Sequence, residues 1–224
     1  MLLLWSQVAA AATFSSVELR LHDPGDGRPM QTVVLFHGYG ATPEGILGLY
    51  QGYPGPLRVV AVRGPAAVGD GFAWYDAPWT KPELFPGDGE AERRERAEEL
   101  ATFLEELGSS SGLPVVVGFS QGGMTAFLLA ARHPELVAGA IPLGGNLPAS
   151  LLPPTLAPVV PVRALHGEAD PVIPVATARD TVAAFVAHGG DARIETFAGV
   201  EHAVSPPMRD RLWTLTAEML ARGP

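Results

Sequence analysis

The sequence contains no cysteine, which excludes disulfides, thiolate metal sites and a cysteine nucleophile. Basic residues are also scarce: 15 Lys and Arg stand against 24 Asp and Glu, giving a formal net charge of -9. This charge argues against nucleic acid or an anionic membrane as a partner. Charged residues make up only 17% and hydrophobic residues 47%, which excludes a disordered chain. At 224 residues the chain is long enough to bury a core, and we expect one α/β domain over residues 1–224.

The apolar segment at residues 1–14 is ambiguous: it resembles the short apolar region of a secretory signal followed by small residues, but the basic region is missing. No Lys or Arg precedes Arg20, whereas a secretory signal starts with a basic region. The segment is also shorter than the ~20 residues that span a bilayer. We favour a first strand or packing arm and expect a cytoplasmic protein without stable membrane insertion. Export, an interface and a membrane-facing patch stay open as alternatives, and so does a homodimer.

Segments with strand-like and helix-like patterns alternate along the chain, which predicts a mostly parallel sheet with helices on both faces. The expected strands cover residues 17–21, 32–36, 58–62, 115–117, 137–143, 162–165 and 192–197. The expected helices cover residues 90–107, 124–130, 174–188 and 207–221.

Three connections carry further expectations. The turn cluster at 23–27 predicts a hairpin between the first two strands. Residues 64–89 are rich in glycine, proline and aromatic side chains and are expected to form a long functional loop. Residues 144–161 are proline-rich and too few for a separate cap domain.

The segment Gly118-Phe119-Ser120-Gln121-Gly122 lies between an expected strand and an expected helix. In that context the pattern is typical of a nucleophile elbow, whose tight turn forces a strained backbone on Ser120. Gly118 and Gly122 then need to be small so that strand and helix can approach. The alternative is an ordinary glycine-rich turn without chemistry, and the flanking strand and helix favour the nucleophile.

A serine hydroxyl needs a general base, and His202 is the best candidate among six histidines. It lies just past the last expected strand, where catalytic loops gather in an open α/β sheet. We interpret the other histidines as structural residues of turns, helix ends and loops: His22, His37, His133, His166 and His188.

The acid that orients this base is expected in the loop after the strand at 162–165. Asp170 is the first choice, because the Asp-Pro step fixes the turn, and Glu168 is the runner-up. The resulting chain order is serine, acid, histidine, which is the order of α/β-hydrolases and not that of the serine proteases.

An oxyanion formed at the substrate needs preorganised donors. The backbone N–H of Gln121 is one expected donor, and the N–H of Tyr39, in the glycine-rich loop after the second strand, is the other. A glycine-rich loop without a catalytic part is the alternative for Tyr39. The aromatic side chains of the long loop are candidate walls of an acyl pocket or, equally, packing on the sheet: Phe72, Trp74, Tyr75 and Trp79.

Together these motifs resemble the phospholipase/carboxylesterase family of small α/β-hydrolases, which includes acyl-protein thioesterases and bacterial carboxylesterases. The matching stretches run from His37 nearly to the C-terminus: His-Gly-x-Gly at 37–40, Trp-Tyr-Asp at 74–76, Gly-Phe-Ser-Gln-Gly-Gly at 118–123, His-Gly at 166–167, Asp-Pro-Val-Ile-Pro at 170–174 and Glu-His at 201–202. The chain departs from the family at Tyr39, where leucine is frequent, and in its first dozen residues.

This resemblance implies a single α/β-hydrolase domain without a cap. It also implies a nucleophile at Ser120, an acid at Asp170, a base at His202, and oxyanion amides at Tyr39 and Gln121. We therefore expect a serine carboxylesterase that hydrolyses short- to medium-chain acyl esters of small molecules, with neither cofactor nor metal. Thioesterase or lysophospholipase action is the close alternative, because both share the acyl-enzyme. A non-catalytic binding protein on the same fold is the alternative of another class.

Overall fold

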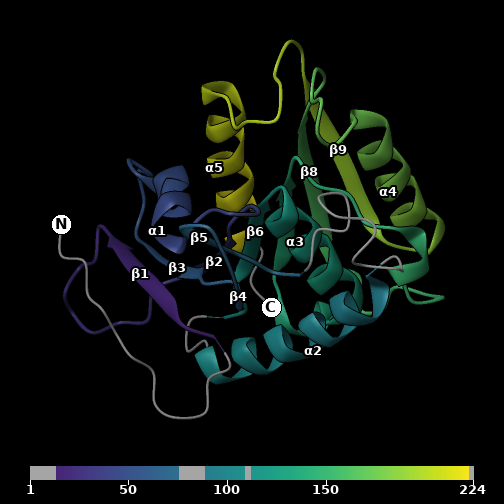
Figure 1. Ribbon diagram of the computed structural model, residues 1–224. Coiled ribbons are helices and arrows are strands. Elements are labelled where there is room, and N and C mark those ends of the chain that lie inside the picture. Colours follow the sequence, from purple (N-terminus) through teal and green to yellow (C-terminus); the bar gives the residue numbers. More distant parts are fainter. Residues whose placement is uncertain (1–13, 76–88, 109–111, 222–224) are drawn as a thin grey trace.

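A seven-stranded sheet forms the centre of the computed structural model, which describes residues 14–75, 89–108 and 112–221 (Figure 1). Its strands, in chain order, are β1 (Ser16–Leu21), β2 (Thr32–Phe36), β3 (Leu57–Val62), β6 (Val115–Phe119), β7 (Gly139–Leu143), β8 (Pro161–Gly167) and β9 (Asp191–Phe197). In space the order is β1-β3-β2-β6-β7-β8-β9, and every neighbouring pair except β1 with β3 is parallel. The predicted mostly parallel sheet is confirmed.

The helices cover both faces of this sheet, because alternate residues of the central strands point into two separate cores. In β2, Val34 and Phe36 face α2, α3 and α4, while Val33 and Leu35 face α1 and α5. All five residues of β2 are buried, as a strand covered on both sides requires.

Helices α2 to α5 lie close to the segments that the sequence predicts, whereas the short α1 falls in a stretch for which no helix is predicted. The helices are α1 (Pro43–Ile46), α2 (Glu90–Leu107), α3 (Gln121–Arg132), α4 (Val175–Ala187) and α5 (Pro206–Leu220), with 3-10 turns η1 (Leu47–Tyr50), η2 (Pro134–Leu136) and η3 (Ala149–Leu151). The start of α5 is fixed by Ser205, whose side chain accepts from the Met208 N–H, and by Pro206 at the first helical position. Capping therefore sets the end of the loop that carries His202.

The predicted hairpin between the first two strands is wrong. Strand β1 pairs antiparallel with β3, from Ser16 opposite Val62 to Leu21 opposite Leu57. Strand β2 has parallel partners on both sides, β3 and β6, so neither of its edges is available to β1. The turn cluster is real, but it leads the chain past β3 into the interior of the sheet.

The predicted long loop contains secondary structure. Strands β4 (Ala66–Val68) and β5 (Gly71–Ala73) form a small antiparallel pair. Its backbone bonds the loop after β2, because Gly40 N–H donates to Phe72 O and Phe72 N–H donates to Ala41 O, both at 2.9 Å. The pair therefore braces the predicted oxyanion loop. Residues 76–88, with Trp79, lie outside the described residues.

Other expectations concern the chain's ends and connections. Residues 1–13 lie outside the described part, so one domain over 1–224 stays a prediction. Phe14, the first described residue, is buried against Trp74 and Phe103. The connection from β7 to β8 holds only the short turn η3, in line with the expected absence of a cap. None of the helices in the described ranges has the length and hydropathy needed to cross a bilayer.

Candidate active site

Ser120 occupies a strained turn between β6 and α3. Its φ of 57° and ψ of -119° lie in a region that side-chain-bearing residues rarely adopt, at a cost of about 1–3 kcal/mol. A Cβ on Gly118 would stand 2.0 Å from the Gly122 oxygen, and one on Gly122 would stand 1.9 Å from the Phe36 oxygen. The predicted strain at Ser120 and the predicted need for two small neighbours are both confirmed.

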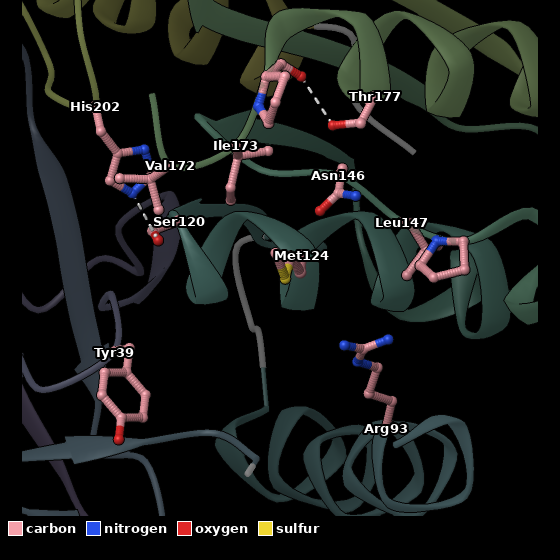
Figure 2. A pocket seen from close by; sticks show the side chains of 12 residues that line it. Tyr39, Arg93, Ser120, Met124, Asn146, Leu147, Val172, Ile173, Thr177 and His202 are labelled. Carbon is pink, nitrogen blue, oxygen red and sulfur yellow. Dashed lines mark hydrogen bonds between the residues drawn. The ribbon is translucent and has the colours of Figure 1, made fainter. Parts of the chain in front are cut away.

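The structure brings Ser120, Asp170 and His202 together from the loops after β6, β8 and β9. His202 Nε2 lies 2.9 Å from Ser120 Oγ (Figure 2). On the other side of the ring, His202 Nδ1 lies 2.6 Å from Asp170 Oδ2. An ionised carboxylate only accepts hydrogen bonds, so Nδ1 carries the proton and Nε2 is free to accept from the serine hydroxyl. The three side chains thus form one continuous hydrogen-bonded chain.

Asp170 is held as a charged group inside the protein. Its Oδ1 accepts from the backbone N–H groups of Val172 and Ile173, at 2.8 and 2.9 Å. Burial raises the pKa of Asp170, but the hydrogen bond from His202 and these two backbone donors outweigh it and leave the pKa below its usual value. The carboxylate that faces His202 is therefore ionised at neutral pH.

Glu168, the runner-up for the acid, points elsewhere. Its Oε1 accepts from Thr196 Oγ1 at 2.7 Å, and 43% of its side chain is exposed. Because it belongs to the surface and not to the interior behind His202, the structure favours Asp170 over Glu168.

Two histidines shape the loops around the site, as predicted. His37 is fully buried; its Nδ1 donates to Gly38 O at 2.8 Å, and its Nε2 accepts from Gly64 N–H at 3.0 Å. Burial lowers the pKa of His37, which is consistent with a neutral ring that both donates and accepts. His166 Nε2 donates to Ile173 O at 2.8 Å and so closes the Asp170 loop. The remaining histidines contact groups away from Ser120: His22, His133 and His188.

The two predicted oxyanion donors lie in segments that flank Ser120. Gln121 is the first residue of α3, where the backbone N–H has no intrahelical acceptor and the helix dipole favours negative charge. The loop that carries Tyr39 passes close to the serine, since a Cβ added at Gly38 would come within 3.5 Å of Ser120 Cβ, and Tyr39 and Ser120 line the same cavity. That these two N–H groups bind an oxyanion stays a prediction.

The assignment of Trp74 and Tyr75 to the pocket wall is wrong, because at most 1% of either residue is exposed. Trp74 Nε1 donates to His37 O at 2.8 Å, and Tyr75 Oη donates to Gln121 O at 3.0 Å. They pack beneath the site and tie its loops together. Phe72 packs on the Arg63 guanidinium and lies outside both cavities that reach His202.

His202 lines both of those cavities. The larger has a volume of about 560 Å³ and includes Ser120 and Tyr39; the smaller has about 380 Å³ and includes Gly38 and Phe119. The sequence did not reveal several residues that line the larger one (Figure 2): Arg93, Met124, Asn146, Leu147, Ile173 and Thr177.

A signal for one of these residues was present in the sequence. Arg93 stands four, seven and eleven residues before Ala97, Leu100 and Leu104, the apolar positions that mark the buried stripe of α2. A charged side chain is unexpected at a position on that buried apolar stripe.

No cluster of three or more histidine, aspartate or glutamate side chains suited to a metal ion occurs within the described ranges.

Known proteins resemble this chain in sequence and in fold. The model of the family described as Phospholipase/Carboxylesterase matches residues 23–214. Esterase YpfH of Escherichia coli strain K12 is 27% identical over 193 residues, which are 80% of this chain and 78% of that protein.

Two solved structures illustrate the likeness in fold. Esterase PE8 superposes with a TM-score of 0.77 and 27% identity, over 92% of this chain and 99% of that one. Acyl-protein thioesterase 2 of Zea mays superposes with a TM-score of 0.67 over 91% and 98% of the two chains, and at 20% identity it speaks for the fold alone. The predicted α/β-hydrolase fold is confirmed.

Proposed function

The chain belongs to the phospholipase/carboxylesterase family, and from that premise we propose that it is a serine carboxylesterase with a Ser120-His202-Asp170 triad. Family membership makes it a hydrolase of carboxylic esters. The serine mechanism rests on one observation, the unbroken chain of hydrogen bonds from Asp170 through His202 to Ser120 at 2.6 and 2.9 Å.

In the acylation step, Ser120 Oγ attacks the ester carbonyl carbon while its proton passes to His202 Nε2. Asp170 stabilises the imidazolium that results and keeps its proton on Nδ1. The carbonyl oxygen becomes an oxyanion, and the N–H groups of Gln121 and Tyr39 bind it. When the tetrahedral intermediate collapses, the C–O bond to the alcohol breaks and His202 returns the proton to the leaving oxygen.

Deacylation repeats these steps with water. His202 takes a proton from the water as its oxygen attacks the acyl carbon, and the same two N–H groups bind the second oxyanion. The acyl–Ser120 bond then breaks, the serine oxygen recovers a proton from His202, and the carboxylic acid leaves.

The two cavities fit the two halves of an ester. The larger contains Ser120 and Tyr39, where the acyl carbonyl sits during the reaction, so we assign the acyl chain to it. The smaller reaches His202 without Ser120, which suits the leaving alcohol that His202 protonates. A cavity of about 560 Å³ lies within the usual range of small-molecule sites, and we propose acyl chains of short to medium length as its occupants.

Labelling with a fluorophosphonate tests the nucleophile. We expect an adduct on Ser120 in the folded wild type, none in Ser120→Ala, and loss of p-nitrophenyl ester turnover in that variant with its circular dichroism unchanged. Absence of the adduct in folded wild type would instead favour a binding protein on a hydrolase fold.

A series of p-nitrophenyl esters tests the acyl range. We expect the highest kcat/KM at short to medium chains, and an optimum at long chains would contradict it. A matched oxoester and thioester, assayed side by side, separate carboxylesterase from thioesterase action, because both proceed through the same acyl-enzyme. We expect the oxoester to be the better substrate.

A further inference from the structure

Arg93 is a buried cation that lines the larger cavity. It projects from α2 towards α3 on the side of the cavity away from His202, and only 8% of it is exposed (Figure 2). Its Nε has no hydrogen-bond partner. Among the described residues no carboxylate lies within ion-pair distance of it, although the charge of Glu92 also acts on Tyr75, the ring beneath the guanidinium. Burying a charge without a counter-ion is costly, so a ligand that supplies one is expected to bind here.

Other arginines with an unbonded Nε do not share this setting. Arg132 donates to Glu98 at 3.1 Å, and Arg209 stacks on the Trp213 ring at 5.3 Å; neither lines the cavity. Arg93 thus combines three properties among the described residues: it is buried, it lacks an anionic partner, and it faces the space in front of Ser120.

The Tyr75 ring fixes the position of the Arg93 guanidinium. The guanidinium lies 5.1 Å from the centre of this ring, a cation–π distance. Tyr75 in turn donates to Gln121 O at 3.0 Å, next to the nucleophile. The guanidinium is therefore held at a fixed distance from Ser120. A group that selects substrates by the length of their acyl chain needs such a fixed position.

The lining between Ser120 and Arg93 describes the rest of the ligand. Met124, Leu147 and Ile173 supply apolar walls, and Asn146 and Thr177 add uncharged polar groups. No Asp or Glu occurs among the described residues that line this cavity. A chain of methylene groups with a negatively charged end fits such a lining.

We propose that Arg93 binds a carboxylate at the far end of the acyl chain, so that the enzyme prefers esters of dicarboxylic acids whose second carboxylate is free. This inference rests on the proposed esterase function. One guanidinium balances one negative charge and matches the two oxygens of a carboxylate, whereas a phosphate monoester carries close to two charges. The single cation therefore favours the carboxylate.

Substrate pairs that differ only in the terminal charge test this proposal. The pairs are p-nitrophenyl monoesters of dicarboxylic acids from adipate to sebacate and their ω-carboxamide analogues, with spontaneous hydrolysis subtracted. We expect wild-type kcat/KM to favour the carboxylate roughly tenfold to a hundredfold at one chain length, the effect of a charge-assisted hydrogen bond. Equal rates at every length, or faster cleavage of the amides, would overturn the proposal.

Variants then identify the group responsible. Arg93→Met keeps an unbranched but shorter side chain and removes the charge, so the ratio of kcat/KM for the carboxylate substrate to kcat/KM for its amide is expected to fall to about one. Arg93→Lys is expected to retain part of the preference. Arg209→Met, the matched control outside the cavity, is expected to keep all of it. An equal loss on both substrates in Arg93→Met contradicts the proposal, since a purely structural role predicts that result.

A binding measurement separates this inference from the proposed chemistry. Ser120→Ala, which turns nothing over, is expected to bind adipate more tightly than adipamide, and Ser120→Ala/Arg93→Met is expected to lose that preference, which separates Arg93 from the donors at the Ser120 end. If Ser120→Ala remained an active esterase, the proposed function would fail while the Arg93 preference could still hold. If Arg93→Met does not fold, Arg93→Lys and the inhibition of wild type by adipate against adipamide decide the question. Equal inhibition by the two compounds would then overturn it.

Discussion

Gln121 and Tyr75 hold each other through two buried hydrogen bonds. The amide Nε2 of Gln121 donates to Tyr75 O at 2.7 Å, and the Tyr75 hydroxyl donates to Gln121 O at 3.0 Å. Trp74 N–H adds a third bond, to Gln121 Oε1 at 2.9 Å. Gln121, the residue after Ser120, is therefore bonded to the segment after β5 through both its side chain and its main chain.

Replacing Gln121 by Leu is expected to cost more stability than replacing Tyr75 by Phe. Gln121→Leu leaves the Trp74 N–H and the Tyr75 carbonyl buried without partners, at about 1–3 kcal/mol for each group. Tyr75→Phe removes one hydroxyl, and Gln121 O keeps its bond from Thr125 Oγ1, so about 1 kcal/mol is expected. Urea unfolding measures both losses in unfolding free energy. Equal losses would show that the hydrogen bonds of the Gln121 side chain contribute no more to stability than the Tyr75 hydroxyl.

Glycine at position 120 is expected to stabilise the fold relative to alanine. Ser120 has φ 57°, a conformation that glycine adopts without the penalty borne by any residue with a Cβ. Neither variant retains the nucleophile, so both are expected to lack esterase activity. Ser120→Gly should unfold at a free energy about 1 kcal/mol higher than Ser120→Ala. A higher stability of the alanine variant would mean that the turn stores no strain.

Two glycine substitutions test the close approach at the elbow. Gly122→Ala is expected to destabilise by several kcal/mol or prevent folding, because its Cβ would stand 1.9 Å from the Phe36 oxygen. Gly48→Ala is the matched control in η1, with no atom within 4 Å of the added Cβ and no unusual φ. Thermal unfolding should show Gly48→Ala within about 1 kcal/mol of wild type. Similar melting temperatures for the two variants would refute a steric limit at Gly122.

The stabilising effect of Asp170 is expected to depend on pH in a defined direction. Its pKa is lower in the folded protein than the ordinary value near 3.9 of an unfolded chain, so the unfolded state binds more protons between the two values. Stability from this group is therefore fully present above about pH 4 and is lost as pH falls through the folded pKa.

Comparison with Asp170→Asn isolates that effect. The difference in unfolding free energy between wild type and variant should be constant near neutrality and shrink below about pH 4. Near neutral pH the variant should also lose kcat by on the order of 10⁴, the effect of the same change in a serine protease triad. A stability difference that grows on acidification would contradict the assigned pKa direction.

The elbow could be predicted from the sequence because its constraints are local. Gly118, Ser120 and Gly122 lie within five residues, and the close contacts among strand, turn and helix follow from that spacing. Loop positions followed from the parallel sheet, which gathers the ends of β6, β8 and β9 at one edge. Hence Asp170 and His202 could be placed near Ser120 without coordinates.

The remaining features depend on partners far away in the chain. The turn at 23–27 shows that β1 ends there, but its pairing with β3 is decided by which edges of the sheet are unoccupied. An aromatic side chain in a glycine-rich segment suits a cavity wall or a core equally well. For Trp74 and Tyr75 the outcome depends on hydrogen bonds to Gln121, some 46 residues later. The sequence shows that Arg93 interrupts an apolar stripe. That it lines a cavity in front of Ser120 is visible only in the structure.

The placement of the site across the sheet also governs when the enzyme becomes active during folding. Ser120 and His202 are 82 residues apart along the chain, and the histidine follows β9, an edge strand that pairs only with β8. Contacts between residues so far apart in the sequence form late, because closing the intervening loop first costs conformational entropy. In a refolding reaction, esterase turnover is therefore expected to return only when β9 pairs with β8. The circular dichroism signal of α2 and α3 is expected to rise earlier.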